Sequence, residues 1–286
     1  MTKQSRLIDN DLRNLGICEG DTLLLRAGLQ GIGRISRDDF LDSLLRVLGE
    51  DGTLIGLSFT IGVPFWKLDS VDPFTVASPS YAGVLPNSML SHPQAYRSKH
   101  PQCSIVAIGR HAKSIVYGHG PKSPAYEPIR RIIELKGKVA IIGCVDSSPG
   151  FTTAHLAEVD LNLHKRVVFP QLLGLTPYID EDGERKVFHR RDPGLCSQSY
   201  WKFYSHYVRA KILRTGYVGN AYSILADAQS SYAVEKSLLS DNPKFTICEN
   251  PNCVTCNMLR WDRLHKIPSL LIRRFYRLLK NHRKNG

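Results

Sequence analysis

The stretch DTLLLRAGLQGIGRISRDDFLDSLLRVLGEDGTLIGLSFT (residues 21–60) decides the fold. Its two apolar runs, 21–26 and 53–60, each predict a buried strand. Between them, Ser36 is a good N-cap for a helix, and the apolar residues that follow recur at helical spacing: Phe40, Leu41, Leu44, Leu45 and Leu48. A strand, a helix and a strand within about 40 residues form a βαβ unit, which favours a parallel pair of strands.

The same alternation continues along the chain. Further strands are predicted at 104–109, 138–144, 166–169 and 186–188, and further helices at 111–117, 129–135, 152–163, 200–215 and 226–239. This pattern predicts an α/β fold with a central, largely parallel sheet flanked by helices. We expect this domain to span residues 1–245. Residues 246–286 we interpret as a cysteine-containing strap followed by a basic amphipathic C-terminal helix.

The charge of the chain is concentrated in its tail. The 286 residues carry a formal net charge of +12, and residues 257–286 contribute +8 of it, with nine Lys and Arg against one acid, Asp262. The body is therefore only mildly basic, and we expect no nucleic-acid partner. No apolar run approaches the roughly 20 residues that cross a bilayer, and the polar N-terminus lacks a signal-peptide core. We therefore expect a cytoplasmic protein.

The tail itself admits more than one role. Residues 261–282 place apolar side chains at helical spacing with Arg and Lys between them, and Pro268 suits a helix start. Such a helix packs on the body or on a second subunit of a homodimer, or it makes peripheral contact with the anionic inner face of a membrane. We favour packing and keep the membrane as the alternative.

The local pattern that indicates chemistry is TTAHLAE (152–158), which follows a predicted strand and a small-residue loop. His155 and Glu158 are three residues apart, so both project to one side of a helix. A carboxylate beside an imidazole orients it and raises its pKa, which makes it a better base. By itself this spacing is more often that of a surface pair.

Several blocks in one order carry a wider resemblance. They are residues 20–25, the turn 27–33, 51–54 with 58–60, 78–86, 97–109, 135–143 and 153–158. Over roughly residues 5–240 the chain resembles the aminoglycoside 3-N-acetyltransferase family. The resemblance implies the antibiotic N-acetyltransferase fold, distinct from the GNAT fold, with acetyl-CoA or another acyl-CoA as co-substrate and no metal required.

The resemblance also implies roles for single residues. His155 falls on the general base for the acceptor amine, and Glu158 on its carboxylate partner. Backbone N–H groups must stabilise the oxyanion, and we place them in the turn 27–31. The cofactor-binding set is then Arg26, Ala27, Gly28, Leu29, Gln30, Gly31, His100 and Ser104. His100 is equally well interpreted as a buried structural residue.

Two positions depart from the family pattern. The family usually has His-Ser where this chain has Arg26-Ala27, and a histidine where it has Cys103. Arg26 has the geometry to meet a phosphate of CoA or of a nucleotide-linked substrate. Cys103 is either a nucleophile for a covalent acyl-enzyme or, as we favour, a small apolar filler of the core.

The acceptor is expected to bind in the loop region 61–82. The candidate substrate-binding residues are Trp66, Asp69, Asp72 and Tyr81. Aromatic side chains stack on sugar rings or nucleobases, whereas a polycationic aminoglycoside calls for more acidic residues than this loop offers. We therefore expect an N-acyltransferase that moves an acetyl or longer acyl group to an amino sugar, with a nucleotide-linked sugar as one form. The alternatives are an aminoglycoside 3-N-acetyltransferase that confers antibiotic resistance, and an inactive membrane-associated binding protein of the same fold.

Three of the seven cysteines cluster near the tail. Cys248, Cys253 and Cys256 are spaced as C-x4-C-x2-C, with His265 as a candidate fourth ligand. Structural zinc sites normally show four ligands in close pairs, and only one close pair is present. We favour reduced thiols or a local staple and keep metal binding as the alternative.

Overall fold

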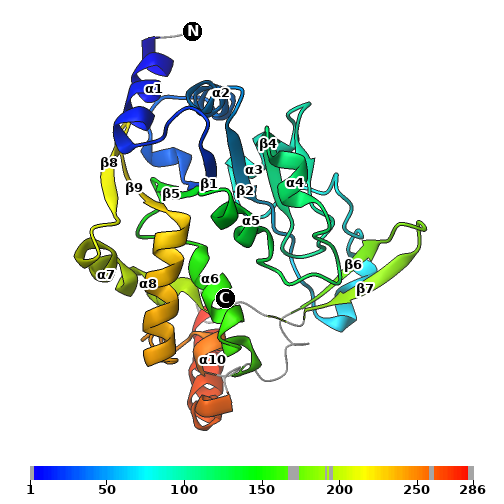
Figure 1. Cartoon of the computed structure of the whole chain (residues 1–286). Coiled ribbons are helices and arrows are strands. Elements are labelled where there is room, and N and C mark those ends of the chain that lie inside the picture. Colours follow the sequence, from blue (N-terminus) through cyan, green and yellow to red (C-terminus); the bar gives the residue numbers. More distant parts are fainter. Residues whose placement is uncertain (1–2, 167–173, 191, 193–195, 258–260, 283–286) are drawn as a thin grey trace.

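The computed structural model describes residues 3–166, 174–190, 192, 196–257 and 261–282. Its centre is a seven-stranded sheet in the order β3-β4-β2-β1-β5-β9-β8 (Figure 1). The strands are β1 (Thr22–Ala27), β2 (Thr53–Leu57), β3 (Tyr96–Arg97), β4 (Ile105–Gly109), β5 (Lys138–Ile142), β8 (Arg214–Val218) and β9 (Ala221–Asp227). A separate hairpin consists of β6 (Leu175–Ile179) and β7 (Arg185–His189).

The predicted α/β class is confirmed, and the parallel pairs lie at the centre of the sheet. β1 pairs in parallel with β2, so that Leu23 lies opposite Leu54. On its other side β1 pairs in parallel with β5, so that Leu25 lies opposite Ala140. The outer pairs are antiparallel, so the sheet as a whole is mixed. β8 and β9 are antiparallel because a tight hairpin joins them, with Gly219 at φ +57°.

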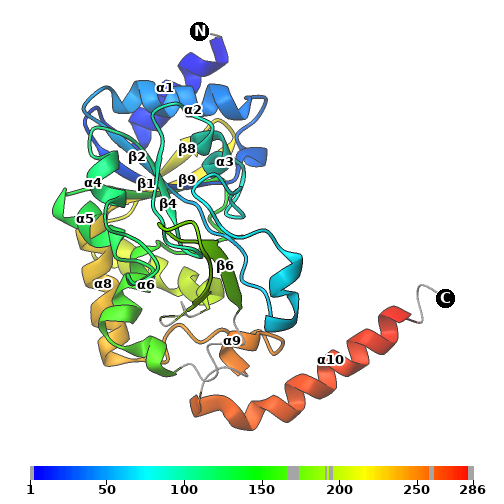
Figure 2. The same cartoon turned by 90° about the vertical axis from the view of Figure 1, so that its right-hand side faces the viewer.

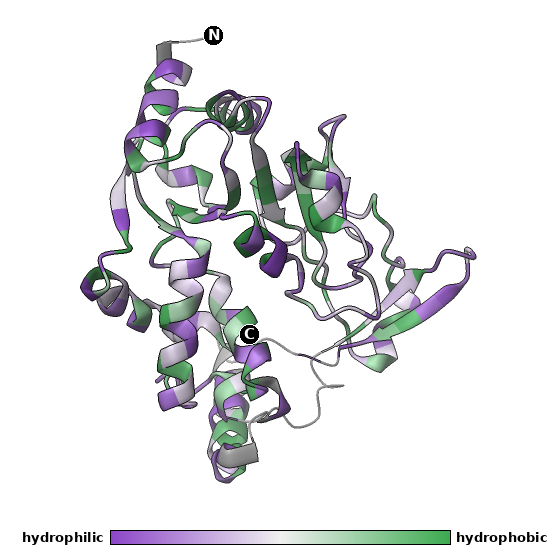
Figure 3. Ribbon diagram, viewed as in Figure 1, coloured by the Kyte–Doolittle hydropathy of each residue, from purple (hydrophilic) through white to green (hydrophobic). Residues whose placement is uncertain are grey.

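Helices cover both faces of the sheet (Figure 2). One face carries α1 (Lys3–Leu15), α2 (Arg37–Leu48) and α3 (Val84–Leu90), and the other carries α4 (Ala112–Val116), α5 (Pro128–Glu134), α6 (Thr153–Asp160) and α8 (Ala228–Asp241). Each face encloses its own apolar core, and the hydrophobic residues concentrate on the strands and on the inner sides of these helices (Figure 3). The result is a three-layer arrangement whose middle layer is apolar on both faces.

The helix predicted after Ser36 forms as expected. Ser36 accepts a hydrogen bond from Asp39 N over 3.0 Å, which satisfies one of the free N–H groups at the start of α2. Gly49 ends the helix at φ +66°. Phe40 and Leu44 are fully buried between α2 and the sheet, as their spacing predicted.

Two predicted helices are wrong at their ends. The segment 200–215, predicted as one helix, contains two shorter ones: the 3-10 helix η5 (Ser197–Phe203) and α7 (Tyr204–Arg209). Residues 214–215 belong to β8. The helix predicted from 226 begins at 228 because β9 continues to Asp227, whose side chain caps α8 by accepting from Ser230 N. The strand at 186–188 is confirmed as part of β7, with β6 as its partner. Of the strand predicted at 166–169, residues 167–169 lie outside the described residues.

The C-terminal segment lies against the body only at its start. It contains the short helix α9 (Val254–Asn257), η6 (Trp261–Lys266) and α10 (Ile267–His282), and α10 extends away from the core (Figure 2). Leu270 is buried, whereas Leu271, Ile272, Phe275 and Tyr276 are exposed. Within the described part of the chain, no helix is both long and apolar enough to cross a bilayer.

Candidate active site

The candidate site lies where the parallel strands end. β5 leads through the loop 143–152 into α6, whose first turn carries His155. In α/β proteins, loops at the carboxyl ends of parallel strands hold reactive groups close together. The helix projects His155 and Glu158 to one side, so the pairing that the sequence predicted does form.

The geometry of His155 fixes which ring nitrogen is available. Nδ1 lies 3.1 Å from Glu158 Oε2 and 2.8 Å from Tyr200 Oη. An ionised carboxylate only accepts hydrogen bonds, so Nδ1 carries the ring proton and Nε2 keeps its lone pair. The His155 side chain is 14% exposed and Glu158 is 2% exposed, so the imidazole is the accessible member of the pair.

Glu158 is held from behind by hydroxyl groups. Thr246 Oγ1 donates to Oε1 over 3.2 Å, and the Tyr200 hydroxyl also hydrogen-bonds to this carboxylate. Burial, followed by the negative charge of Glu158, raises the pKa of Tyr200 well above its usual value, so the phenol stays protonated and remains a donor. The carboxylate therefore has fixed partners on both oxygens.

Tyr126 forms one wall of the site. Its ring stacks on the imidazole of His155 with centroids 4.7 Å apart and an interplanar angle of 14°. Arg190, next to the hairpin β6–β7, hydrogen-bonds to the Tyr126 hydroxyl. Burial raises the pKa of Tyr126, so it too is neutral. No spacing signal pointed to Tyr126, Arg190 or Tyr200, because each comes from a different segment.

Arg26 reaches the loop that precedes α6. Its guanidinium donates to Ser148 Oγ and Ser148 O, each over 2.9 Å, and to Gly150 O. Desolvation by burial lowers the pKa of Arg26. These bonds brace the loop between β5 and α6. The expected contact of Arg26 with a phosphate stays a prediction.

The turn 27–31 lies beside the same loop. Gly28 N donates to Ile142 O over 2.8 Å, and a Cβ on Gly28 would come within 2.8 Å of Gly143 O. The glycine is thus required by the close contact of two backbone segments. Leu29, Gln30 and Gly31 form the 3-10 helix η1, whose first N–H groups have no partner inside the helix. Ala27 ends β1 directly before this turn.

His100 and Ser104 are buried in the body. His100 Nδ1 accepts from Cys103 N over 2.9 Å, and its ring stacks on His119 with centroids 4.8 Å apart. Burial, helped by His119, lowers the pKa of His100 to about 2, so the ring is neutral. Ser104 Oγ donates to Ser58 O and accepts from Arg97 Nε. These contacts fit the structural interpretation of His100, and the contacts of His100 and Ser104 with the cofactor stay predictions.

Cys103 is a buried thiol in the core beneath the site. It is 2% exposed, and burial raises its pKa, which keeps the thiol protonated. A protonated, enclosed thiol is a poor nucleophile. The geometry therefore agrees with the apolar-filler interpretation.

The candidate acceptor residues lie on an exposed loop. Trp66 and Tyr81 are 69% and 65% exposed, and Asp69 and Asp72 are exposed as well. The loop is tied to the hairpin β6–β7 by bridges between Val63 and Leu175 and between Phe74 and Tyr178. The four residues therefore line an open surface.

Arg97 organises this loop, and the sequence analysis did not single it out. Its guanidinium donates to Ser78 O, Val76 O and Ser58 O and lies 4.9 Å from the centre of the Phe74 ring. Burial lowers the pKa of Arg97 to about 10. One arginine thereby fastens the loop 58–78 to the sheet.

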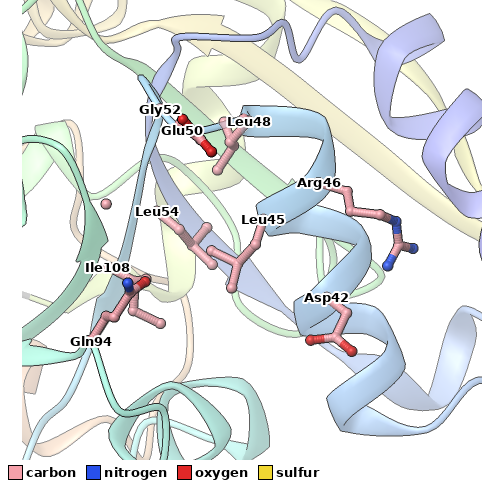
Figure 4. Close-up of a pocket in the computed structure, with 11 residues that line it drawn as sticks. Asp42, Leu45, Arg46, Leu48, Glu50, Gly52, Leu54, Gln94 and Ile108 are labelled. Carbon is pink, nitrogen blue, oxygen red and sulfur yellow. The ribbon is translucent and has the colours of Figure 1, made fainter.

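A cavity lies away from this site. It measures about 450 Å³ and is lined by the end of α2, the start of β2 and the end of β4 (Figure 4). Because β1 runs parallel to both β2 and β5, this is the opposite end of the sheet from the loop that leads to His155. Leu45 and Leu54 face each other across it. The candidate catalytic residues are not among its lining residues.

The C-terminal cysteines meet a fourth one. Cys196, which precedes η5, joins Cys248, Cys253 and Cys256, and the four Sγ atoms all lie within 4.8 Å of one another. His265, the fourth ligand considered from the sequence, is exposed on η6. No local spacing connects Cys196 with the other three cysteines, because it is far from them along the chain.

Comparisons with known proteins agree with this architecture. A family model described as Aminoglycoside 3-N-acetyltransferase matches residues 24–240. Aminoglycoside N(3)-acetyltransferase IX of Micromonospora chalcea is 26% identical over 252 residues, covering 77% of this chain and 88% of that protein. Aminoglycoside N(3)-acetyltransferase III of a Salmonella species is 27% identical over 198 residues, covering 63% and 67%.

Solved structures share the fold. A mutant of aminoglycoside acetyltransferase AAC(3)-IVa with a histidine changed to alanine, in complex with a gentamicin, superposes with a TM-score of 0.75 at 23% identity and covers 90% of this chain and 96% of that one. The binary complex of AAC-IIIb with CoASH superposes with a TM-score of 0.64 at 23% identity and covers 83% and 96%.

Proposed function

This chain belongs to the aminoglycoside 3-N-acetyltransferase family, whose model matches most of its length, and from this premise we propose that it acetylates an amine of an aminoglycoside with His155 as general base. Family membership makes it an N-acetyltransferase that uses acyl-CoA. The observation that carries the proposed mechanism is the engagement of His155 Nδ1 by Glu158 and Tyr200, while no residue in the described part of the chain hydrogen-bonds to Nε2.

The free nitrogen supplies what amine acylation needs. An alkylammonium is a poor nucleophile until it loses a proton, and Nε2 of His155 accepts that proton. The amine nitrogen then attacks the thioester carbonyl carbon and the carbon–sulfur bond breaks. The imidazolium gives its proton to the departing CoA sulfur, and the second proton that the nitrogen loses as the amide forms passes to the regenerated imidazole and on to solvent. Glu158 stabilises the imidazolium that forms in between, because it lies 3.1 Å from Nδ1.

The oxyanion of the tetrahedral intermediate needs backbone donors. We place them at Leu29 and Gln30, because Gly28 N already donates to Ile142 O and the N–H of Gly31 closes the first turn of the 3-10 helix η1. N–H groups at the start of a short helix point outward without a competing partner. The buried thiol of Cys103 has no role in this scheme, which is a direct transfer.

For the acceptor, two observations outweigh the small number of acidic residues in the loop 61–82. Relatives of this chain are named for aminoglycosides, and structural neighbours hold a gentamicin and sisomicin. The loop is also open and carries three exposed aromatic side chains, Phe65, Trp66 and Tyr81, which suit the faces of sugar rings. A nucleotide-linked amino sugar is the competing acceptor.

An acceptor panel tests the proposal. Purified enzyme is incubated with acetyl-CoA and, separately, gentamicin, sisomicin, kanamycin and a nucleotide-linked amino sugar such as UDP-glucosamine, and products are identified by mass spectrometry. We expect one added acetyl group on the aminoglycosides. Acetylation of the nucleotide sugar alone would overturn the proposed acceptor, and no acetylation of any amine would support the inactive-protein alternative.

The helix α10 supports a second, separate role. Leu271, Ile272, Phe275 and Tyr276 are 52–68% exposed, and Arg273, Arg274 and Arg277 lie among them. Apolar and basic side chains on one exposed helix suit peripheral contact with an anionic membrane surface. We propose that contact for α10, in preference to packing on the body, because most of the helix extends away from it (Figure 2).

A further inference from the structure

We propose that Cys196, Cys248, Cys253 and Cys256 bind one zinc ion, and that this ion fastens η5 to the C-terminal strap behind the catalytic carboxylate. The strap is defined here as residues 246–257. The four cysteines come from two separate parts of the chain, and they meet at one point with all Sγ atoms within 4.8 Å of one another.

The separations of the sulfur atoms fit a tetrahedral metal site. Zinc–sulfur bonds of about 2.3 Å place the sulfurs of a tetrahedron about 3.8 Å apart. Cys253 Sγ and Cys196 Sγ are 3.5 Å apart, close to that edge length and far longer than the roughly 2.05 Å of a disulfide. All seven cysteines of the chain are free thiols.

The surroundings of the sulfurs also resemble a metal site. Cys248 N points at Cys256 Sγ over 3.5 Å, a contact that stabilises a thiolate. Asn250 folds the segment between Cys248 and Cys253, because its side chain accepts a hydrogen bond from Asn252 N over 2.9 Å. Asn257 Nδ2 donates to Asn250 O and Cys253 O, which closes the loop around the cluster.

The ligand set identifies both the ion and its kind of role. Four cysteine sulfurs in a tetrahedral cluster select zinc among the common divalent ions. With four protein ligands, no coordination position remains for water or substrate, so the site is structural. Cys248 and Cys256 are 6% and 2% exposed, which places the cluster inside the fold.

The position of the cluster connects it to His155. Cys196 is followed directly by η5, which carries Tyr200, and Cys248 follows Thr246 by two residues. Tyr200 hydrogen-bonds to His155 Nδ1, and Thr246 to Glu158. The same two segments are joined by Ser199 Oγ donating to Thr246 O over 2.5 Å and Lys202 Nζ donating to Ile247 O over 3.1 Å. A metal at the cysteines holds both segments in register.

Metal content tests the site directly and does not depend on any activity. The full chain is expressed with zinc in the medium, passed through a metal-free column, and analysed by elemental mass spectrometry. We expect one zinc per chain, released when a mercurial titrates the thiols. Less than about a tenth of an equivalent of zinc, or a disulfide between these cysteines in non-reducing mass spectrometry, would overturn the proposal.

Matched variants locate the ion. Cys253→Ser is expected to lower the zinc content at least about tenfold, whereas Cys18→Ser, which changes an exposed thiol elsewhere, is expected to keep one equivalent. Where Cys253→Ser does not fold, cobalt replaces zinc in the unaltered chain. The absorption of tetrahedral thiolate-bound cobalt is then expected, and its absence would also overturn the proposal.

A separate measurement, the melting temperature, tests whether the zinc ion joins η5 to the strap. Removing zinc from the unaltered protein with a chelator is expected to lower Tm by at least about 5 °C, because the ion binds the folded state only. Re-addition of zinc is expected to restore it. An unchanged Tm in a protein shown to lose its zinc would contradict the role in joining η5 to the strap.

Discussion

Thr246 Oγ1 donates a hydrogen bond to Glu158 Oε1 over 3.2 Å. The two residues are 1% exposed each, and Thr246 lies at the start of the C-terminal strap. The carboxylate that orients His155 is thus supported by a segment far along the chain from α6. A substitution in the strap is therefore expected to alter the orientation of the His155 imidazole through Glu158, although the substituted residue does not contact the ring.

Thr246→Val tests this connection. Valine keeps the shape of threonine and removes the donor, so the carboxylate loses one of its partners and the imidazole loses part of its orientation. We expect kcat to fall about tenfold, which corresponds to about 1.4 kcal/mol in the barrier. Steady-state kinetics at saturating acetyl-CoA measures this.

Thr246→Ser is the matched control, since it retains the hydroxyl. It is expected to keep at least half of the turnover. If valine and serine lower kcat equally, packing at residue 246 and not the hydrogen bond to Glu158 is what matters.

His155→Ala tests the general base itself. Loss of a positioned base typically costs roughly 10²–10⁴-fold in rate, and we expect a fall in kcat of that size. The affinity for CoA, measured by calorimetry, is expected to change less than about twofold, because the imidazole acts on the amine. A kcat of the His155→Ala variant near that of the unaltered enzyme would contradict the proposed mechanism.

Arg26→Ala distinguishes two roles of one arginine. Its guanidinium holds Ser148 and Gly150, so we expect a loss of roughly 2–4 kcal/mol in the free energy of unfolding, as buried acceptors lose their donors. Urea unfolding measures it. A KM for acetyl-CoA that stays within about twofold supports bracing of the loop, whereas an about tenfold rise at unchanged stability indicates contact with a phosphate.

The centre of the fold could be predicted from the sequence because the local sequence patterns there all indicate the same structure. Ser36, the apolar spacing of α2 and the apolar runs on either side all indicate one βαβ unit, and β1 and β2 do pair in parallel. The hairpin β8–β9 was missed because the sequence pattern assigns its ends, residues 214–215 and 226–227, to the neighbouring helices and residues 216–225 to no element. Pairing with β5, a long-range contact, decides in favour of the strand.

Only part of the candidate site could be predicted from the sequence, for a related reason. His155 and Glu158 share a helix, and their spacing alone predicts that they meet. Tyr200, Tyr126 and Thr246 reach the same point from three other segments, so only tertiary structure brings them there. Cys196 could not be predicted as a ligand for the same reason. It lies far along the chain from the other three cysteines, so no short sequence motif includes it.

The exposed side of α10 predicts binding to anionic lipid. We expect the full chain to sediment with vesicles that contain phosphatidylglycerol and to stay in the supernatant with phosphatidylcholine alone. Changing Leu271 and Phe275 together to serine is expected to abolish sedimentation. Tyr117→Ser, which alters an exposed aromatic on the body, is the control and is expected to sediment normally. Binding that is insensitive to both lipid charge and the double change would contradict this role.

His119 predicts a loss of stability in acid. Its ring is buried and hydrogen-bonds to Ser98 Oγ over 2.9 Å, and burial lowers its pKa to about 4. The unfolded chain binds this proton near pH 6.5, so between these values the unfolded state holds more protons and stability falls as the pH falls. The shift corresponds to roughly 3 kcal/mol lost between about pH 6.5 and 4.

His119→Gln keeps a hydrogen-bonding side chain and removes the titration, because a neutral glutamine cannot take up the proton that His119 binds on unfolding. Urea unfolding between about pH 7 and 4.5 is expected to show a shallower fall in stability for this variant than for the unaltered protein. His189→Gln, which changes an exposed histidine on β7, is expected to leave the slope unchanged. Equal slopes for all three proteins would show that the buried ring does not govern acid sensitivity.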